Sequence, residues 1–275
     1  MRIAANISLL FADLPLPARF AAAAGAGFEG VEIQFPYDHD ASTLAQAAQA
    51  AGMPVVLINI PAGDIAGGDV GLGALPDRRA EFRAAVQRCI PYARALGVQR
   101  VNILSGRPGA QADRAVCHAT LVENLRHAAE AFAPFGIRVL VEPVNPFDVP
   151  GFFLDSLDAA LRVLDDAAHP NAGLQFDLYH MARTEPDLPA AIARAGARIA
   201  HVQFADTPGR HEPFSGAIDF AAAVAALDRA GYADWFAAEY RPLGATADGI
   251  GWLGQLRDLL APLTHRPTPS ALNPP

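Results

Sequence analysis

The chain has 275 residues, of which 52% are hydrophobic and 18% are charged, so it can bury a large apolar core. Its formal net charge of −8 argues against broad binding to nucleic acids or to anionic membranes. No apolar stretch approaches the roughly 20 residues of a membrane-spanning helix, and residues 1–10 are more typical of a first strand than of a signal peptide.

Strand-like and helix-like segments alternate along the chain. The predicted strands cover residues 3–9, 28–34, 55–60, 100–104 and 137–142, and three more end at Asp177, Gln203 and Glu239. The predicted helices cover residues 15–26, 41–51, 78–96, 111–133, 155–168, 186–196, 217–230 and 248–261. Eight strand–helix units without a composition break predict an α/β fold, a (β/α)₈ TIM barrel, as one domain over residues 1–263. A doubly wound sheet is the alternative, and the proline-rich residues 264–275 are expected to form a loose tail.

The two cysteines, Cys89 and Cys117, fall in helical patterns and lack the spacing of metal ligands. We expect them to be reduced, buried and inert, as in a cytoplasmic protein. A homo-oligomer is one expected assembly.

The fifth predicted strand, residues 137–142 (IRVLVE), is typical of a strand buried on both faces, because its apolar run has no polar alternation. This run leads directly into Glu142, and the next three strands lead into Asp177, Gln203 and Glu239. Polar residues at the C-terminal strand ends line the active site of a TIM barrel. We therefore expect the four side chains to meet at one mouth, the alternative being four separate solvated residues.

Three carboxylates at one mouth would repel one another, and one would have to stay protonated unless a cation is present. Two glutamates, one aspartate and one amide offer an all-oxygen set, which suits hard cations. The predicted cofactor is therefore a divalent metal, Mg²⁺ or Mn²⁺. Its predicted ligands are Glu142, Asp177, Gln203 and Glu239.

Other polar residues near these strand ends have two interpretations each. His201 shares a strand face with Gln203, one layer lower, so it either contacts substrate or packs beneath the site. Arg210, in the loop after the seventh strand, either grips a substrate carboxylate bidentately or is solvated. The glycine-rich segment 61–75 lacks the dinucleotide fingerprint and is either a flexible lid or a surface loop. Alternating polar residues of the first two strands are expected to fill the barrel or its mouth: Asn6, Ser8, Glu32 and Gln34.

Several segments resemble the hydroxypyruvate isomerase family, which belongs to the xylose isomerase-like barrels and includes 2-oxo-tetronate isomerases. They are residues 35–38 (FPYD), 61–64 (PAGD), 92–97 (YARALG), 118–125 (HATLVENL), 142–143 (EP), 147–151 (FDVPG), 177–181 (DLYHM) and 239–240 (EY). Together they span nearly the whole chain except the tail.

The resemblance implies that Glu142 and Glu239 are the acid–base pair. It also implies that the metal set of the related isomerases and epimerases falls on the four strand-end residues. Gln203 stands where the epimerases have histidine, which places this chain nearer the hydroxypyruvate branch. The chain departs from the family resemblance at Ile58, where relatives often have histidine, and at Arg241, where they often have lysine. Both differences are expected to alter substrate contacts, and neither touches the predicted metal ligands.

Substrate contacts are implied in the same way. His180 resembles a substrate-binding histidine of the epimerases, with a satisfied wall residue as the alternative. The expected substrate contacts are His180, Arg210, Asp148 and His201.

The predicted activity is a metal-assisted, aldose–ketose-type isomerisation of hydroxypyruvate to tartronate semialdehyde through an enediolate. Alternatives within the family are a 2-oxo-tetronate isomerase and a ketose 3-epimerase or sugar isomerase. An apurinic-site endonuclease is disfavoured by the acidic charge and by the scarcity of histidines near strand ends. A non-catalytic sugar-acid binder does not need two opposed carboxylates beside a metal. The expected partner is a small hydroxy-oxo acid.

Overall fold

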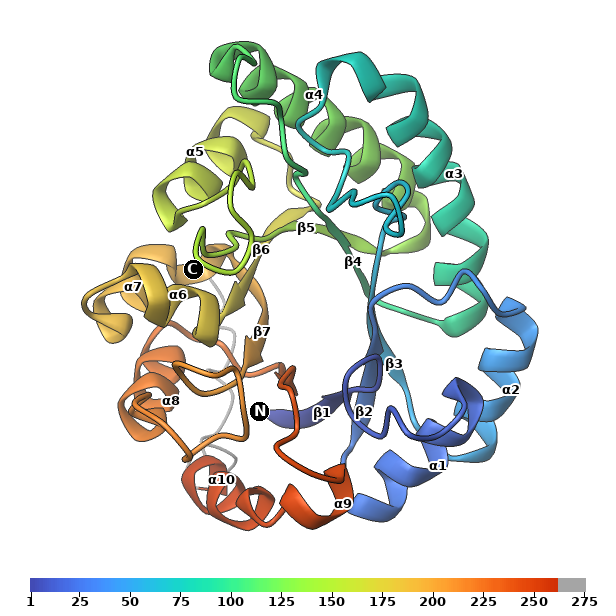
Figure 1. Cartoon of the computed structure of the whole chain (residues 1–275), viewed down its shortest axis with the longest axis vertical. Helices are drawn as coiled ribbons and strands as arrows, with labels where there is room; N and C mark the ends of the chain where they lie inside the picture. The colour runs from blue at the N-terminus through green and yellow to red at the C-terminus, as the bar shows by residue number, and fades with distance from the viewer. Residues whose placement is uncertain (262–275) are drawn as a thin grey trace, which may run out of the picture.

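A computed structural model describes residues 1–261, and its eight strands form one closed parallel barrel (Figure 1). Neighbouring strands follow chain order, and β1 pairs with β8 to close the barrel. The strands are β1 (Arg2–Asn6), β2 (Gly30–Ile33), β3 (Val55–Asn59), β4 (Arg100–Ile103), β5 (Arg138–Val141), β6 (Ala172–Asp177), β7 (Ile199–Phe204) and β8 (Trp235–Ala238). The predicted (β/α)₈ TIM barrel is confirmed.

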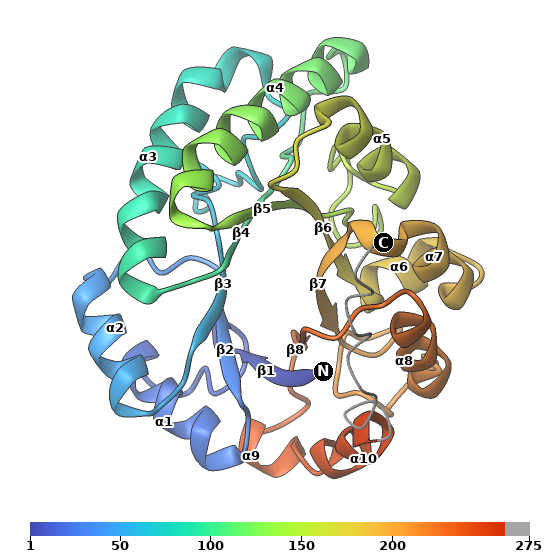
Figure 2. The ribbon, with the colours of Figure 1, turned by 180° about the vertical axis from the view of Figure 1, so that it is seen from behind.

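Helices surround the barrel on its outside, as the view from behind also shows (Figure 2). They are α1 (Leu16–Ala26), α2 (Ala41–Ala50), α3 (Arg79–Leu96), α4 (Arg114–Phe132), α5 (Leu157–Ala167), α6 (Leu178–Thr184), α7 (Leu188–Ala195), α8 (Phe220–Arg229), α9 (Thr246–Gly249) and α10 (Trp252–Leu260). Short 3₁₀ turns cover Pro76–Arg78, Ala133–Phe135 and Gly196–Arg198. Within residues 1–261, no helix combines the length and the apolar character that crossing a bilayer requires.

Local capping explains where several helices begin and end. Aspartate carboxylates accept backbone N–H groups at the starts of α4, α7 and α8, from Asp113, Asp187 and Asp219. Ser156 caps α5 in the same way, and Leu157 and Leu164 of this helix are buried. Gly27 ends α1 with a φ of 94°, a left-handed conformation that glycine adopts without strain.

Helix α6 was not predicted from the sequence, and the last predicted helix is two separate helices in the structure. Strand β6 ends at Asp177 as predicted, but the same residue also caps α6, because its carboxylate accepts the Tyr179 N–H at 2.8 Å. The chain therefore passes from strand to helix without a loop. The predicted helix 248–261 is two helices, α9 and α10. The predicted domain boundary after residue 263 and the tail 264–275 lie outside the described residues.

The barrel interior changes from apolar to polar along its axis. An apolar cluster fills the part nearer the strand starts and consists of Ala4, Val56, Leu57, Leu140, Ala200, Trp235 and Ala237. Trp235 takes so much of this space that a Cβ on Gly30 would lie 2.8 Å from its ring. Truncating a buried aromatic side chain typically lowers the free energy of unfolding by about 3–5 kcal/mol, so this layer stabilises the barrel. The polar side chains lie at the opposite end.

Both cysteines are free and buried, as expected. Cys89 lies in α3, where burial raises the pKa of its thiol to about 12. A thiol with so high a pKa stays protonated and unreactive near neutral pH.

Candidate active site

A cavity of about 220 Å³ lies at the C-terminal ends of the strands. Its polar lining consists of Gln34, Asn59, Asp69, Glu142, Gln175, His180, Arg210 and Glu239. Its apolar lining consists of Phe35, Ala62, Ile65, Val70, Leu104, Val144, Val149 and Phe152. Pockets for drug-sized ligands typically measure about 300–1,000 Å³, so this one suits a metabolite of few carbon atoms.

The segment 61–75 forms one wall of this cavity, through Ala62, Ile65, Asp69 and Val70. The Asp69 carboxylate accepts two N–H groups of Arg78, each at 2.7 Å, and the backbone N–H of Asp64 at 2.7 Å. A Cβ on Gly71 would lie 2.3 Å from the Leu104 carbonyl oxygen, so the backbones are in close contact there. These contacts favour a fixed wall over a mobile lid.

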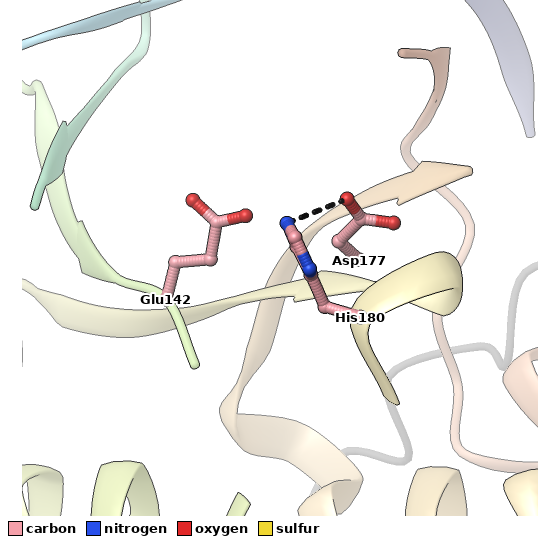
Figure 3. A group of neighbouring side chains, drawn as sticks. All are labelled: Glu142, Asp177 and His180. Carbon is pink, nitrogen blue, oxygen red and sulfur yellow. Dashed lines mark ion pairs between the residues drawn. The ribbon is translucent and has the colours of Figure 1, made fainter. Parts of the chain in front are cut away.

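The side chains of Glu142, Asp177 and His180 lie close together where β5 and β6 end (Figure 3). Their ligand atoms all lie within 4.8 Å of one another. The first turn of α6 brings His180 beside Asp177, with its Nε2 atom 3.6 Å from Asp177 Oδ2. The other ring nitrogen, Nδ1, accepts from the Asn145 side-chain amide at 2.7 Å, which sets the orientation of the imidazole.

Arg210 hydrogen-bonds to Glu239, the third carboxylate of the site. Its Nη2 donates to Glu239 Oε2 at 2.5 Å and to Asp177 Oδ2 at 3.1 Å, and its guanidinium lies over the Tyr179 ring at 5.2 Å. Arg210 has a φ of 57°, in the left-handed region that non-glycine residues rarely adopt. Such a conformation costs on the order of 1–3 kcal/mol and is characteristic of functional sites.

A buried polar layer lies beneath the cavity and consists of Asn6, Glu32, Asn102, His201 and Gln203, with Gln175 joining it to the cavity lining. The carboxylate of Glu32 accepts from His201 Nε2 and, at 2.8 Å, from Gln203 Nε2. Gln175 Nε2 donates to Gln203 Oε1 at 2.7 Å and to Glu142 Oε2 at 2.8 Å. This layer therefore connects the middle of the barrel to the carboxylates above it.

The sequence over residues 20–256 matches the model of the xylose isomerase-like TIM barrel family. The chain belongs to this family. The 2-oxo-tetronate isomerase of Cupriavidus necator is 41% identical over 252 residues, which are 92% of this chain and 97% of that protein. The hydroxypyruvate isomerase of Escherichia coli is 40% identical over 257 residues, 94% of this chain and all of that protein.

A solved structure agrees with this assignment. The crystal structure of a Brucella melitensis protein described as an AP endonuclease, family 2, superposes with a TM-score of 0.90 at 39% identity. The superposition covers 92% of this chain and 98% of that one. Because the two curated relatives are isomerases and match nearly their full lengths, this chain is an isomerase of the family, as predicted.

The electrostatics of the isomerase site are dominated by buried carboxylates. Burial raises the pKa of Glu142 well above its usual value, and the nearby charges of Glu239 and Asp177 raise it further. Burial also raises the pKa of Asp177, against the opposing effect of Arg210. For Glu239 the pKa rises to about 7, again mainly through burial and against Arg210. Burial lowers the pKa of His180, and Arg210 lowers it further, so the imidazole is neutral and keeps a lone pair.

The residues present fit a divalent cation. Glu142 and Asp177 bring carboxylate oxygens close together beside His180, and burial raises the pKa of both groups because ionised carboxylates are poorly solvated there. Among the described residues that line the cavity, Arg210 alone has a permanent positive charge. Gln203 is the cross-strand neighbour of Asp177 in the β6–β7 register, so its amide lies next to this group. A hard cation would offset the repulsion that one guanidinium only partly relieves.

The sequence-predicted residues occupy different layers of the site. Glu142, Glu239, His180 and Arg210 line the cavity. His201 does not line it but contacts Glu32 below, which agrees with the packing alternative. Asp148 is exposed and accepts from the Asn145 amide at 3.0 Å, outside the cavity lining. Arg241, where relatives often have lysine, is also exposed and outside the lining.

Sequence reasoning missed Gln175 and Asn102, both of which donate to Glu142 Oε2, at 2.8 and 2.9 Å. A signal for Gln175 was available, because it precedes Asp177 by two residues and strand side chains repeat every two residues. Asn102 lies in β4, and its partner becomes evident only from the β4–β5 register, which pairs it with Leu140 two residues before Glu142.

The raised carboxyl pKa values predict how the stability of the metal-free isomerase depends on pH. Glu239 has a folded-state pKa of about 7, above its usual 4.5, so the folded state binds its proton more tightly than the unfolded state. Stability from this group is present below the unfolded pKa and is lost as pH rises toward the folded pKa. We expect the Tm of chelator-treated protein to fall less steeply over this interval in Glu239→Gln. An equal dependence of Tm on pH in the natural protein and in Glu239→Gln would contradict the raised pKa of Glu239.

Proposed function

We propose that this isomerase interconverts hydroxypyruvate and tartronate semialdehyde with the help of Mg²⁺ or Mn²⁺. The observation that carries the proposal is the placement of Glu142 after β5 and Glu239 after β8. Both line one small cavity, and strands β6 and β7 separate them, so they approach a bound substrate from different sides. Two carboxylates in this arrangement suit a reaction that removes a proton from one carbon and returns one to its neighbour.

The reaction balances without an oxidant or a reductant. One glutamate takes the proton from the hydroxymethyl carbon, and the electron pair forms an enediolate with the adjacent carbonyl. The other glutamate supports proton delivery to the former carbonyl carbon, while the hydroxyl proton moves between the two oxygens. Burial raises the pKa of both groups, and that of Glu239 to about 7, which suits proton transfer near neutral pH.

The proposed metal ligands are Glu142, Asp177, Gln203 and Glu239, while His180, whose Nδ1 accepts from Asn145, keeps its proton on Nε2 and can donate it beside Asp177. When bound, a divalent cation polarises a carbonyl and stabilises negative charge that develops on oxygen. Neighbouring amide side chains would keep the ligands in place, because Asn102 and Gln175 donate to Glu142 while Asn6 and Gln34 donate to Glu239. Fixed donors of this kind need no rearrangement during the reaction.

The proposed substrate class is a small hydroxy-oxo acid because Arg210 can hold a carboxylate. It lines the cavity beside Glu239, and although its Nη2 donates to Glu239 and Asp177 and its Nε to the Glu239 carbonyl, its Nη1 group can donate to an anion. The relatives named for hydroxypyruvate and for 2-oxo-tetronate match about equally well, and both names denote 2-oxo acids. The small cavity favours the three-carbon acid, and 2-oxo-tetronate is the alternative.

Metal removal tests the proposal directly. Thorough chelation is expected to abolish hydroxypyruvate turnover and to lower Tm, and added Mn²⁺ should restore both, because a ligand that binds only the folded state stabilises it. Full activity in protein shown by elemental analysis to lack metal would contradict the metal-assisted reaction. A parallel assay on abasic DNA separates the nuclease alternative, for which the net charge of −8 offers no support.

A further inference from the structure

Glu32, in β2, is fully buried at the centre of the polar layer beneath the cavity. Its Oε1 contacts His201 Nε2, and its Oε2 accepts from Gln203 Nε2 at 2.8 Å and from Asn6 Nδ2 at 3.2 Å. An amide side chain can donate a hydrogen bond only through its nitrogen. Asn6 and Gln203 therefore both direct their amide nitrogen toward Glu32, and this contact sets the orientation of each amide group.

For Gln203, this orientation decides which atom remains for a cation. With Nε2 committed to Glu32, the oxygen Oε1 faces away and accepts from Gln175 Nε2 at 2.7 Å. The orientation of Gln175 is also determined by a carboxylate, since the same nitrogen donates to Glu142 Oε2 at 2.8 Å. An amide oxygen has two lone pairs, so one stays available beside Asp177, the cross-strand neighbour of Gln203.

Asn6 extends the effect of Glu32 to the other side of the site. Its Nδ2 donates to Glu32 and, at 2.9 Å, to Glu239 Oε1. Its Oδ1 accepts the backbone N–H of Ser8 at 3.1 Å, so the amide has one consistent orientation. Glu32 thus contacts two side chains of the site. One is Asn6, which donates to Glu239, and the other is Gln203.

We propose that Glu32 is a positioning residue that makes Gln203 present its oxygen, and not its nitrogen, to the divalent cation. This inference rests on the metal site of the proposed function. With glutamine at position 32, one of the two acceptor oxygens becomes an NH₂ group, so the nitrogens of Asn6, His201 and Gln203 face a single oxygen. The Gln203 amide can then turn and direct Nε2, which is a donor and no ligand, toward the cation. Removing a partner that orients a metal ligand typically lowers metal affinity about 10–100-fold.

The test compares Mn²⁺ affinity, measured by titration calorimetry, in the natural protein, in Glu32→Gln and in the swapped variant Glu32→Gln/Gln203→Glu. We expect Glu32→Gln to bind Mn²⁺ about 10–100-fold more weakly. The swapped variant has the same formal charge as the natural protein and restores one N–H···O bond between the two positions, with its direction reversed. Because a carboxylate at position 203 can only present oxygen, this variant is expected to recover the natural affinity or exceed it.

Glu29→Gln serves as the matched control, since it makes the same substitution at an exposed residue just before β2. Its Mn²⁺ affinity is expected to equal that of the natural protein. Unchanged affinity in Glu32→Gln, or weak binding that the swap does not recover, would overturn the positioning role while leaving the metal proposal standing. Absence of Mn²⁺ binding in the natural protein would instead overturn the metal proposal, and the inference with it. The Tm of each metal-free variant shows whether a loss of affinity reflects unfolding.

Discussion

Replacing Glu142 or Glu239 by glutamine is expected to lower kcat for hydroxypyruvate by at least about 10²–10⁴-fold, the usual contribution of general acid–base catalysis. Glutamine keeps the size of the side chain and one ligand oxygen, but it cannot take up a proton. Both glutamates line the cavity and are buried, so water cannot readily replace them as proton acceptors. The decrease is larger if the substitution also weakens metal binding.

Steady-state kinetics at saturating Mn²⁺, together with the Tm of each variant, separate loss of catalysis from loss of folding. Glu29→Gln is the matched control, with an exposed side chain remote from the cavity lining, and its kcat is expected to be unchanged. A Glu142→Gln or Glu239→Gln variant that binds metal and retains nearly full kcat would show that the substituted residue is at most a ligand.

The second large effect is expected for Arg210→Ala on substrates that carry a carboxylate. Truncating one partner of a buried, hydrogen-bonded charge pair costs about 2–5 kcal/mol, which corresponds to about 30-fold or more in kcat/KM. The loss should appear mainly in KM for hydroxypyruvate and 2-oxo-tetronate. A neutral ketose has no carboxylate for the guanidinium to hold, so its turnover should change much less.

Arg241→Ala is the matched control, because its side chain is exposed one loop further along the chain and does not line the cavity. Mn²⁺ binding should persist in both arginine variants, since neither removes a proposed ligand. Equal losses on acidic and neutral substrates would contradict the role of Arg210 in carboxylate binding. A natural protein that prefers a neutral ketose would point instead to an epimerase or sugar isomerase.

Local patterns in the sequence were sufficient for the barrel and for its strand-end carboxylates. The apolar run before Glu142 and the similar runs before Asp177 and Glu239 predict buried parallel strands, because such strands have no solvated face. Closed barrels place their strand ends at one mouth, so the meeting of these side chains followed from the fold class alone. The helix that starts directly at Asp177 was missed, because a residue that ends a strand and caps a helix has no distinct local pattern.

The sequence by itself therefore determined the fold class, the family resemblance and the carboxylates that face the cavity. Only the tertiary structure decided that Glu32 accepts from Gln203, that His180 lies beside Asp177, and that His201 lies below the cavity. These contacts join residues on different strands, and they depend on strand register and on the direction of each amide. Neither property leaves a periodic signal along one strand, so they become visible only when the barrel is closed.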